Sequence, residues 1–202
     1  MDMWKKWTAL GLVTLLLSAA GLCGSAAAQQ RALAARLIRL HVVAASDDAA
    51  DQARKLRVRD VLLPRITALT ADCLDAEAAA ARLGAALPEL AALAAGTLGT
   101  GEPVGASLAR EPFPRRDYEG FSLPAGPYRA LRIVLGAGRG HNWWCVAFPA
   151  LCLPAAEDAA GFDEAAAAAG IFDAERALMQ PDSPQVRIKF RLLDWLAAVF
   201  AP

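Results

Sequence analysis

The sequence has little of what nucleic-acid binders and many enzymes require. Its 202 residues include only two histidines, and 21 lysines and arginines are balanced by 21 aspartates and glutamates. With a formal net charge of +0 there is no basic excess to neutralise phosphates, which argues against nucleic-acid binding. The hydrophobic fraction of 56% is inflated by alanine, but it is too high for a disordered chain. The length suits one domain, or one domain with appendages.

Several catalytic and cofactor motifs are also missing. No serine stands in a Gly-x-Ser-x-Gly elbow. The glycine run at 136–140 departs from the dinucleotide-binding pattern, because His141 occupies the position of the last glycine. Zinc-ligand residue types are present, but their spacing matches no zinc pattern. They are His41, His141, Cys145 and Cys152. We therefore expect no metal and no cofactor.

The first 28 residues have the layout of a secretory signal peptide. Lys5 and Lys6 precede an apolar run at 7–17, and alanines at 26–28 offer small side chains for cleavage near Ala28. An uncleaved anchor is the alternative, although the apolar run is short for a membrane span of about 20 residues. The sequence therefore predicts export.

Export bears on the cysteines that follow the predicted signal peptide. An oxidising compartment permits a disulfide, and Cys145 with Cys152 is the natural pair. Cys73 is then the odd thiol, expected on a helix face. In the alternative interpretation all three are small buried side chains, since sequence alone does not establish pairing.

Local patterns predict three strands. Residues 37–45 are apolar on both faces and rich in β-branched side chains, which favours an interior strand. Residues 104–110 and 128–135 alternate, and we expect them to pair antiparallel across a loop that Pro112 begins.

Helices are predicted between these strands. Ser46, Asp47 and Asp48 offer N-cap oxygens for a helix that continues to about Thr70, with a kink or restart at Pro64. Its expected buried side includes Ala53, Leu56 and Leu63, and Asp51 and Lys55 are spaced as an i,i+4 pair. A second helix over 75–98 should be kinked at Pro88.

Together these elements indicate an α+β domain with a small, mainly antiparallel sheet covered by helices. The predicted organisation is a signal peptide at 1–28, a core domain at 29–153, an alanine-rich variable segment at 154–183 and a C-terminal helix at 184–202 that packs on the core. The first half of the last segment also alternates, so a strand there is an alternative.

The stretch from Gly136 to Cys152 concentrates glycines, two tryptophans and two cysteines. Trp143 and Trp144 are adjacent, so in an extended backbone they point to opposite sides. One of them is then a candidate interface anchor. The alternative is that both pack inside the domain.

Five stretches resemble, in order, the stage II sporulation protein R family of endospore-forming bacteria. They are residues 38–47, 51–60, 113–118, 123–133 and 138–152, and the last contains Asn-Trp-Trp-Cys followed by a second cysteine. Three departures are Ala45, His141 and the segment 155–182.

The resemblance implies a signalling protein and not an enzyme. Such a protein is exported from the forespore into the space between the two membranes of the sporulating cell. There it activates a membrane-embedded aspartic protease of the mother cell, which cleaves the precursor of sigma-E. The alternative is a secreted hydrolase acting on cell-wall or peptide bonds, with His41, Asp47 and Asp51 as acid–base candidates. The residues expected to contact the partner are His41, Ser46, Asp47, Asp51, Arg59, Asn142, Trp143 and Trp144.

Overall fold

A computed structural model describes residues 3–99, 101–118, 121–150, 171 and 177–180. Four helices and six strands follow one another within these ranges. In chain order they are α1 (Met3–Arg36), β1 (Ile38–Val43), α2 (Ala49–Thr70), α3 (Ala76–Ala85), α4 (Leu87–Leu98), β2 (Val104–Phe113), β3 (Arg116–Asp117), β4 (Ser122–Leu123), β5 (Gly126–Leu135) and β6 (Asn142–Phe148).

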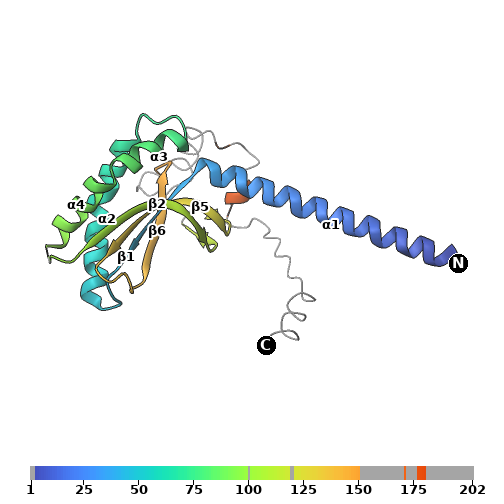
Figure 1. The fold of residues 1–202 in the computed structure, drawn as a ribbon, viewed down its shortest axis with the longest axis horizontal. Coiled ribbons are helices and arrows are strands. Elements are labelled where there is room, and N and C mark those ends of the chain that lie inside the picture. The colour runs from blue at the N-terminus through green and yellow to red at the C-terminus, as the bar shows by residue number, and fades with distance from the viewer. Residues whose placement is uncertain (1–2, 100, 119–120, 151–170, 172–176, 181–202) are drawn as a thin grey trace.

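A four-stranded sheet with the order β2-β5-β1-β6 forms the centre of the domain (Figure 1). The pairs β2–β5 and β1–β6 are antiparallel, as expected for a mainly antiparallel sheet. The central pair β1–β5 is parallel, which the sequence analysis did not predict. Parallel neighbours need a long crossover, and here α2, α3, α4 and β2 supply it. β3 and β4 form a separate two-stranded sheet.

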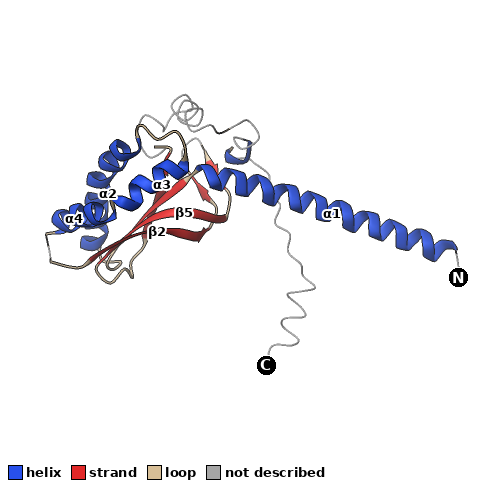
Figure 2. Ribbon diagram, turned by 45° about the horizontal axis from the view of Figure 1, so that its top comes forward, coloured by secondary structure: helices blue, strands red, loops and turns tan. Residues whose placement is uncertain are grey.

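The interior position predicted for β1 is confirmed. All six of its residues are buried, because the sheet is covered on both faces. Ile38, Leu40 and Val42 belong to the larger apolar core with α2, α3 and α4, which lie together on one side of the sheet (Figure 2). Arg39 and His41 alternate with them and point to the opposite face.

The long helix α2 differs from its prediction in two respects. It continues through Pro64 to Thr70 as a single helix, with no restart. Its buried side is Val58, Leu62 and Ile66, spaced four residues apart, whereas the predicted Leu56 is 39% exposed. The predicted Ala53 is also exposed, and Leu63 is partly buried against the core.

The predicted helix over 75–98 is two helices. Asp75 caps α3 by accepting hydrogen bonds from the backbone N–H groups of Glu77 and Ala78. Pro88 lies in the first turn of α4, where its missing N–H costs nothing, so the first helix ends and a second begins. Gly99 ends α4 with a left-handed φ of 64°.

Two strand boundaries also differ from the prediction. β2 continues through Pro112 to Phe113, because a proline is tolerated on an edge strand whose N–H faces away from the sheet. The segment Asn142–Phe148 is a strand of its own, β6, which is not among the three strands predicted from the sequence.

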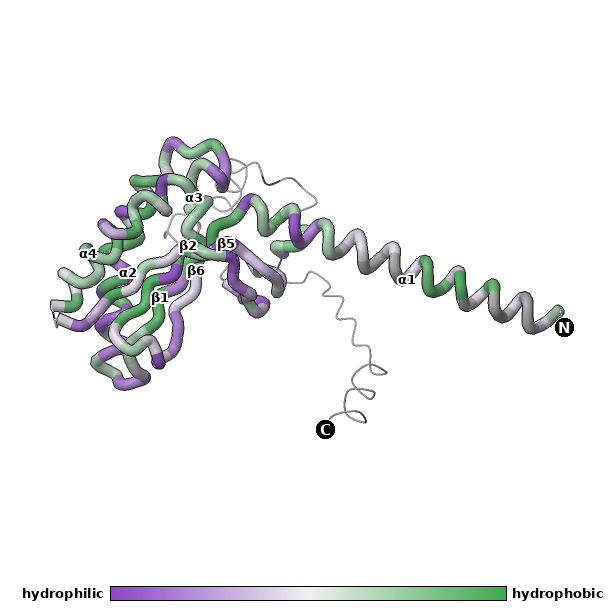
Figure 3. The backbone as a smooth tube through the Cα atoms, in the orientation of Figure 1, coloured by the Kyte–Doolittle hydropathy of each residue, from purple (hydrophilic) through white to green (hydrophobic). Residues whose placement is uncertain are grey.

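The helix α1 includes the predicted signal peptide. Only its C-terminal end packs on the domain, through Leu33 and Ala34, and the rest extends away from the sheet (Figure 1). Apolar side chains in this outer part are exposed, including Trp4, Trp7 and Leu17, and the tube in Figure 3 shows the apolar run. The signal peptide and its cleavage stay predictions. The variable segment and the predicted C-terminal helix lie almost wholly outside the described residues.

In the described part of the chain, no single helix is long and apolar enough to cross a membrane. The helices α3 and α4 reach the length and hydropathy of a membrane span only when they are joined, and a bend of 61° separates them. Leu83, Leu90 and Ala94 of this pair are buried in the core.

The buried side of α2 can be tested with two leucines. Leu62→Ala should lower the free energy of unfolding by about 2–5 kcal/mol, because it leaves a cavity under a fully buried side chain. Leu56→Ala, the matched control on the exposed side, should change it by less than about 1 kcal/mol. Urea unfolding of both full-length variants, followed by circular dichroism, makes the comparison. Equal losses would contradict the assigned face.

Candidate functional site

Three of the polar residues singled out in the sequence, Ser46, Asp47 and Asp51, lie with His141 at one end of the sheet. Because β1 and β5 are parallel, their carboxyl ends lie at the same edge, and the chain leaves them through segments 44–48 and 136–141. Two backbone hydrogen bonds join these segments, from Arg139 N to Ala45 O (3.1 Å) and from Gly140 N to Ala44 O (3.0 Å). We call Ser46, Asp47, Asp51, Arg139 and His141 the polar end.

Glycine is required in this loop for close packing. Gly136 and Gly138 have φ of 53° and 61°, which side chains rarely adopt. A Cβ on Gly140 would collide with the backbone carbonyl of Ser46. The glycines therefore let segment 136–141 turn and lie directly on segment 44–48.

Ser46 fixes the carboxylate of Asp51. Its hydroxyl donates to Asp51 Oδ2 at 2.6 Å, and Arg54 Nη1 donates to Asp51 Oδ1 at 2.6 Å. The Ser46 hydrogen bond is the main cause that holds the pKa of Asp51 below its usual range, with Arg54 adding to it. The sequence predicted an ion pair of Asp51 with Lys55. In the structure Asp51 instead pairs with Arg54, three residues along α2.

The predicted capping of α2 is also corrected. Asp48 is the N-cap residue, but its side chain accepts no capping hydrogen bond. The Ser46 hydroxyl instead accepts from Asp48 N at 3.2 Å and donates to Asp51, so it stabilises the turn before the helix.

Asp47 and His141, 94 residues apart, meet across the two loops. The backbone N–H of His141 donates to Asp47 Oδ1 at 2.6 Å, and the His141 ring nitrogen Nδ1 contacts the same oxygen. The backbone N–H is the leading cause of the lowered pKa of Asp47. Both side chains are exposed, at 81% for His141 and 53% for Asp47.

The first turns of α2 hold both loops in place. Gln52 Nε2 donates to Ser46 O at 2.9 Å, and Lys55 Nζ donates to His141 O at 3.0 Å. Lys55 is itself buried, and burial lowers the pKa of its ammonium group. The polar end is thus a surface whose exposed groups are held by a network of hydrogen bonds.

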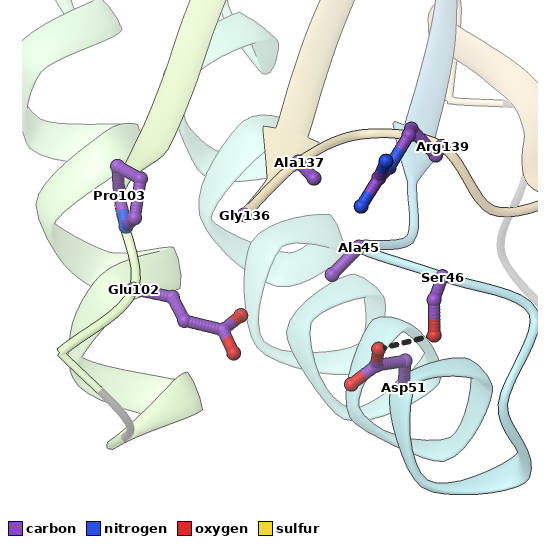
Figure 4. Close-up of a pocket in the computed structure, with 8 residues that line it drawn as sticks. All are labelled: Ala45, Ser46, Asp51, Glu102, Pro103, Gly136, Ala137 and Arg139. Carbon is purple, nitrogen blue, oxygen red and sulfur yellow. Dashed lines mark hydrogen bonds between the residues drawn. The ribbon is translucent and has the colours of Figure 1, made fainter.

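A pocket of about 430 Å³ opens beside the polar end. Figure 4 shows Glu102 and Arg139 extending toward it from opposite sides, with Asp51 and Ser46 hydrogen-bonded below. Sequence analysis did not select Glu102 or Arg139, because their neighbourhood depends on the meeting of β1, β5 and the start of β2. The described residues contain no group of three or more histidine, cysteine or acidic side chains placed to hold a metal.

His41 and Trp144 lie elsewhere, on the sheet face opposite α2. Their rings stack at 4.9 Å between centroids and 11° between planes. His41 Nε2 is 3.0 Å from Glu111 Oε2, and burial of the imidazole is the leading cause of its lowered pKa, despite this carboxylate. Phe113 contacts both rings edge-on, at 5.5 Å from His41 and 5.0 Å from Trp144.

The two tryptophans therefore face opposite sides of the sheet. Trp143 packs against the helical core, and the Arg59 guanidinium lies 5.2 Å from its ring centroid. Asn142 is at the start of β6, paired with Val43. The eight predicted contact residues are thus divided among the polar end, the α2–β6 side and the opposite sheet face.

Sequence analysis did not single out Arg39, which is fully buried. Its guanidinium lies over the rings of Phe113, Tyr128 and Tyr118, at 4.5, 5.2 and 5.7 Å. It donates to Cys145 O at 3.2 Å and to the Tyr118 hydroxyl at 2.6 Å. An arginine within a predicted interior strand is the sequence signal that marks such a position.

Cys73 is a free thiol in the connection between α2 and α3, and not on a helix face as predicted. Cys145 is buried and disulfide-bonded. Cys152 lies outside the described residues, so its pairing with Cys145 stays a prediction.

Ser46→Ala should raise the pKa of Asp51 toward the ordinary 3.8, because it removes the hydrogen bond that contributes most to lowering it. A carboxyl group with a lowered pKa contributes stability above its unfolded pKa and loses it as pH falls through the folded pKa. As pH falls, the protonation of Asp51 should therefore reduce the free energy of unfolding less in this variant than in the wild type.

Carbon-13 NMR titration of the aspartate carboxyls measures this change. Asp47 serves as the internal control, since its pKa is lowered by His141 and not by Ser46. An unchanged Asp51 titration in Ser46→Ala would contradict the assigned hydrogen bond.

Comparison with known proteins places the chain in a family. Residues 34–158, which include every element from β1 to β6, match stage II sporulation protein R. All five stretches of the resemblance lie in this region. The stage II sporulation protein R of Bacillus subtilis (strain 168) is 38% identical over 118 residues, which cover 57% of this chain and 53% of that protein. The chain thus matches about half the length of this relative, and no solved structure matches it. The chain belongs to the stage II sporulation protein R family, which supports a role in sporulation.

Proposed function

We propose that this protein is an exported signal of sporulation that binds the outer face of a membrane-embedded aspartic protease of the mother cell. Binding promotes cleavage of the sigma-E precursor by that protease. Family membership supports the sporulation role, and the signal-peptide pattern at 1–28 supports export.

The polar end is the surface that best supports a docking function. Asp47 and His141 are exposed, yet both are held by hydrogen bonds to groups on other segments. A surface that is already ordered loses less conformational entropy when a partner binds. Ser46, Asp47, Asp51 and His141 also lie inside the family match. The polar end is therefore suited to a docking contact.

Activation requires more than tight binding. A ligand shifts an equilibrium between inactive and active states only by its difference in affinity for the two. Moving a protease from about 1% to about 99% active needs a preference of about 10⁴-fold, or roughly 5.5 kcal/mol. The docking surface must accordingly contact parts of the protease that differ between its states.

The contact of Asp47 with His141 also favours a second candidate, a secreted hydrolase, since a carboxylate beside a histidine can orient a general base. The nearby hydroxyl is less suited to this chemistry. Ser46 donates to Asp51 and not to His141, so these residues do not form a relay from hydroxyl to imidazole to carboxylate. The docking function fits the geometry better.

Co-expression in a non-sporulating host tests the proposal. The full-length chain, the protease and the sigma-E precursor are produced together, and the cleaved fraction of the precursor is measured by immunoblot. The wild-type chain should raise cleavage above the level with the protease alone. The proposal is wrong if exported, folded chain leaves cleavage at that level.

Changes at the polar end should weaken this response. Asp47→Ala and His141→Ala should each lower cleavage by about tenfold or more, the size expected for a central interface contact. Glu89→Ala is the matched control: Glu89 is also an exposed carboxylate in an ion pair, with Arg65 on the outer side of α2 and α4. If precursor cleavage is equal with all three variants, the polar end is not part of the docking surface.

A further inference from the structure

β2 is the terminal strand of the sheet, and in the described structure only β5 pairs with it. Its outer edge therefore presents the backbone N–H and C=O groups of alternate residues, which can pair with another strand. Natural edge strands are usually protected by charges, prolines or bulges. Residues 104–109, Val-Gly-Ala-Ser-Leu-Ala, contain no charge and no proline. This part of the edge has no such protection.

A groove lies between α3 and this edge strand, on the helix side of the sheet, and it extends to Arg129 of β5. It has a volume of about 420 Å³, and Leu108, Ala80 and Ala81 form its apolar part. The helix approaches the strand closely, since a Cβ on Gly84 would be 3.9 Å from the Leu108 Cδ2 atom. The alanine walls leave room for small side chains of an added strand.

Two arginines at the groove indicate the charge of its occupant. Arg110 on β2 and Arg129 on β5 are direct cross-strand partners, and like charges so placed are destabilising. Glu77 of α3 offsets one of them, with its carboxylate 2.8 Å from Arg129 Nη1. Arg110 is exposed and forms no ion pair with any residue that the structure describes. The groove therefore has an unneutralised guanidinium that suits a carboxylate.

The opposite side of β2 also accommodates an added strand. Gly105, Ser107 and Ala109 alternate with the groove-facing residues and are exposed. Their small side chains leave the surface beside the edge free of bulky groups.

We propose that the outer edge of β2 and the groove beside α3 bind an extended segment of the partner protein as a fifth strand. The segment contributes backbone hydrogen bonds along β2, a small apolar side chain in the groove and a carboxylate that contacts Arg110. Strand addition beside a helix provides affinity through the main chain and specificity through the groove. The identity of the partner rests on the proposed function, whereas the edge and its occupant do not.

Filling the groove tests the proposal. Ala81→Leu places a larger side chain in the groove, on the exposed side of α3, and should lower precursor cleavage in the co-expression assay by about tenfold or more. Ala92→Leu is the matched control, an exposed alanine of α4 that does not line the groove, and should retain wild-type cleavage. Circular dichroism confirms that both variants fold.

The charge requirement is tested at Arg110. Arg110→Glu should lower cleavage to a similar extent, because the reversed charge repels the carboxylate. Arg110→Lys keeps the charge and should retain most of it. Equal cleavage by the wild type, Arg110→Glu and Ala81→Leu would overturn the proposal.

Photocrosslinking tests binding at the edge of β2 without relying on activation of the protease. A photoreactive residue at Ala109, exposed on the face of β2 opposite the groove and next to the edge, should form an adduct with the protease, and Ala81→Leu should abolish the adduct. An adduct with only a second copy of the chain, or no adduct, would overturn this inference. If wild-type chain fails to stimulate cleavage but the adduct forms, the proposed activation fails while strand addition stands.

Discussion

The parallel pairing of β1 with β5 is the constraint on which the rest of the domain depends. Parallel neighbours cannot be joined by a tight turn, so the chain between them must cross the sheet. That crossover contains α2, α3 and α4, which supply most of the apolar core on one face. The same pairing brings the ends of both strands to one edge. Together with the pairing of Val43 and Asn142 at the start of β6, it brings Asp47 to His141, although the two residues are 94 positions apart.

On the other face of the sheet, a buried arginine packs among aromatic rings. Fully burying a guanidinium costs several kcal/mol in lost hydration. Arg39 regains part of this from two hydrogen bonds and three aromatic rings, and its position on a central strand leaves it no path to water. Burial of the guanidinium holds its pKa below the usual value. The ring of Phe113 contacts both Arg39 and His41, so these two polar groups share one aromatic support.

Local patterns in the sequence predicted the strands β1, β2 and β5, and their alternation predicted which residues of β5 share a face. The parallel pairing was missed because it depends on contacts between distant segments. β6 was missed because Asn142–Phe148 is bulky on both sides, so it does not alternate. The face of α2 was misassigned because Leu56 and Leu62 are the same residue type, and only packing distinguishes them. At the polar end, the sequence identified Ser46, Asp47 and Asp51, but not the partners that segment 136–141 brings to them.

The polar end and the edge of β2 are connected by the strand itself. β2 begins beside the polar end, where Gly136 N donates to Pro103 O at 2.9 Å, and it continues to the groove at Arg110. Seven residues of extended strand span about 24 Å, so one short segment could reach both surfaces. Each surface has charges of both signs, with Glu102, Asp51 and Arg139 lining the pocket and Arg110, Arg129 and Glu77 lining the groove. Of these groups, Arg110 has no ion-pair partner among the described residues, so the carboxylate of the proposed segment that contacts it defines how the segment lies along β2.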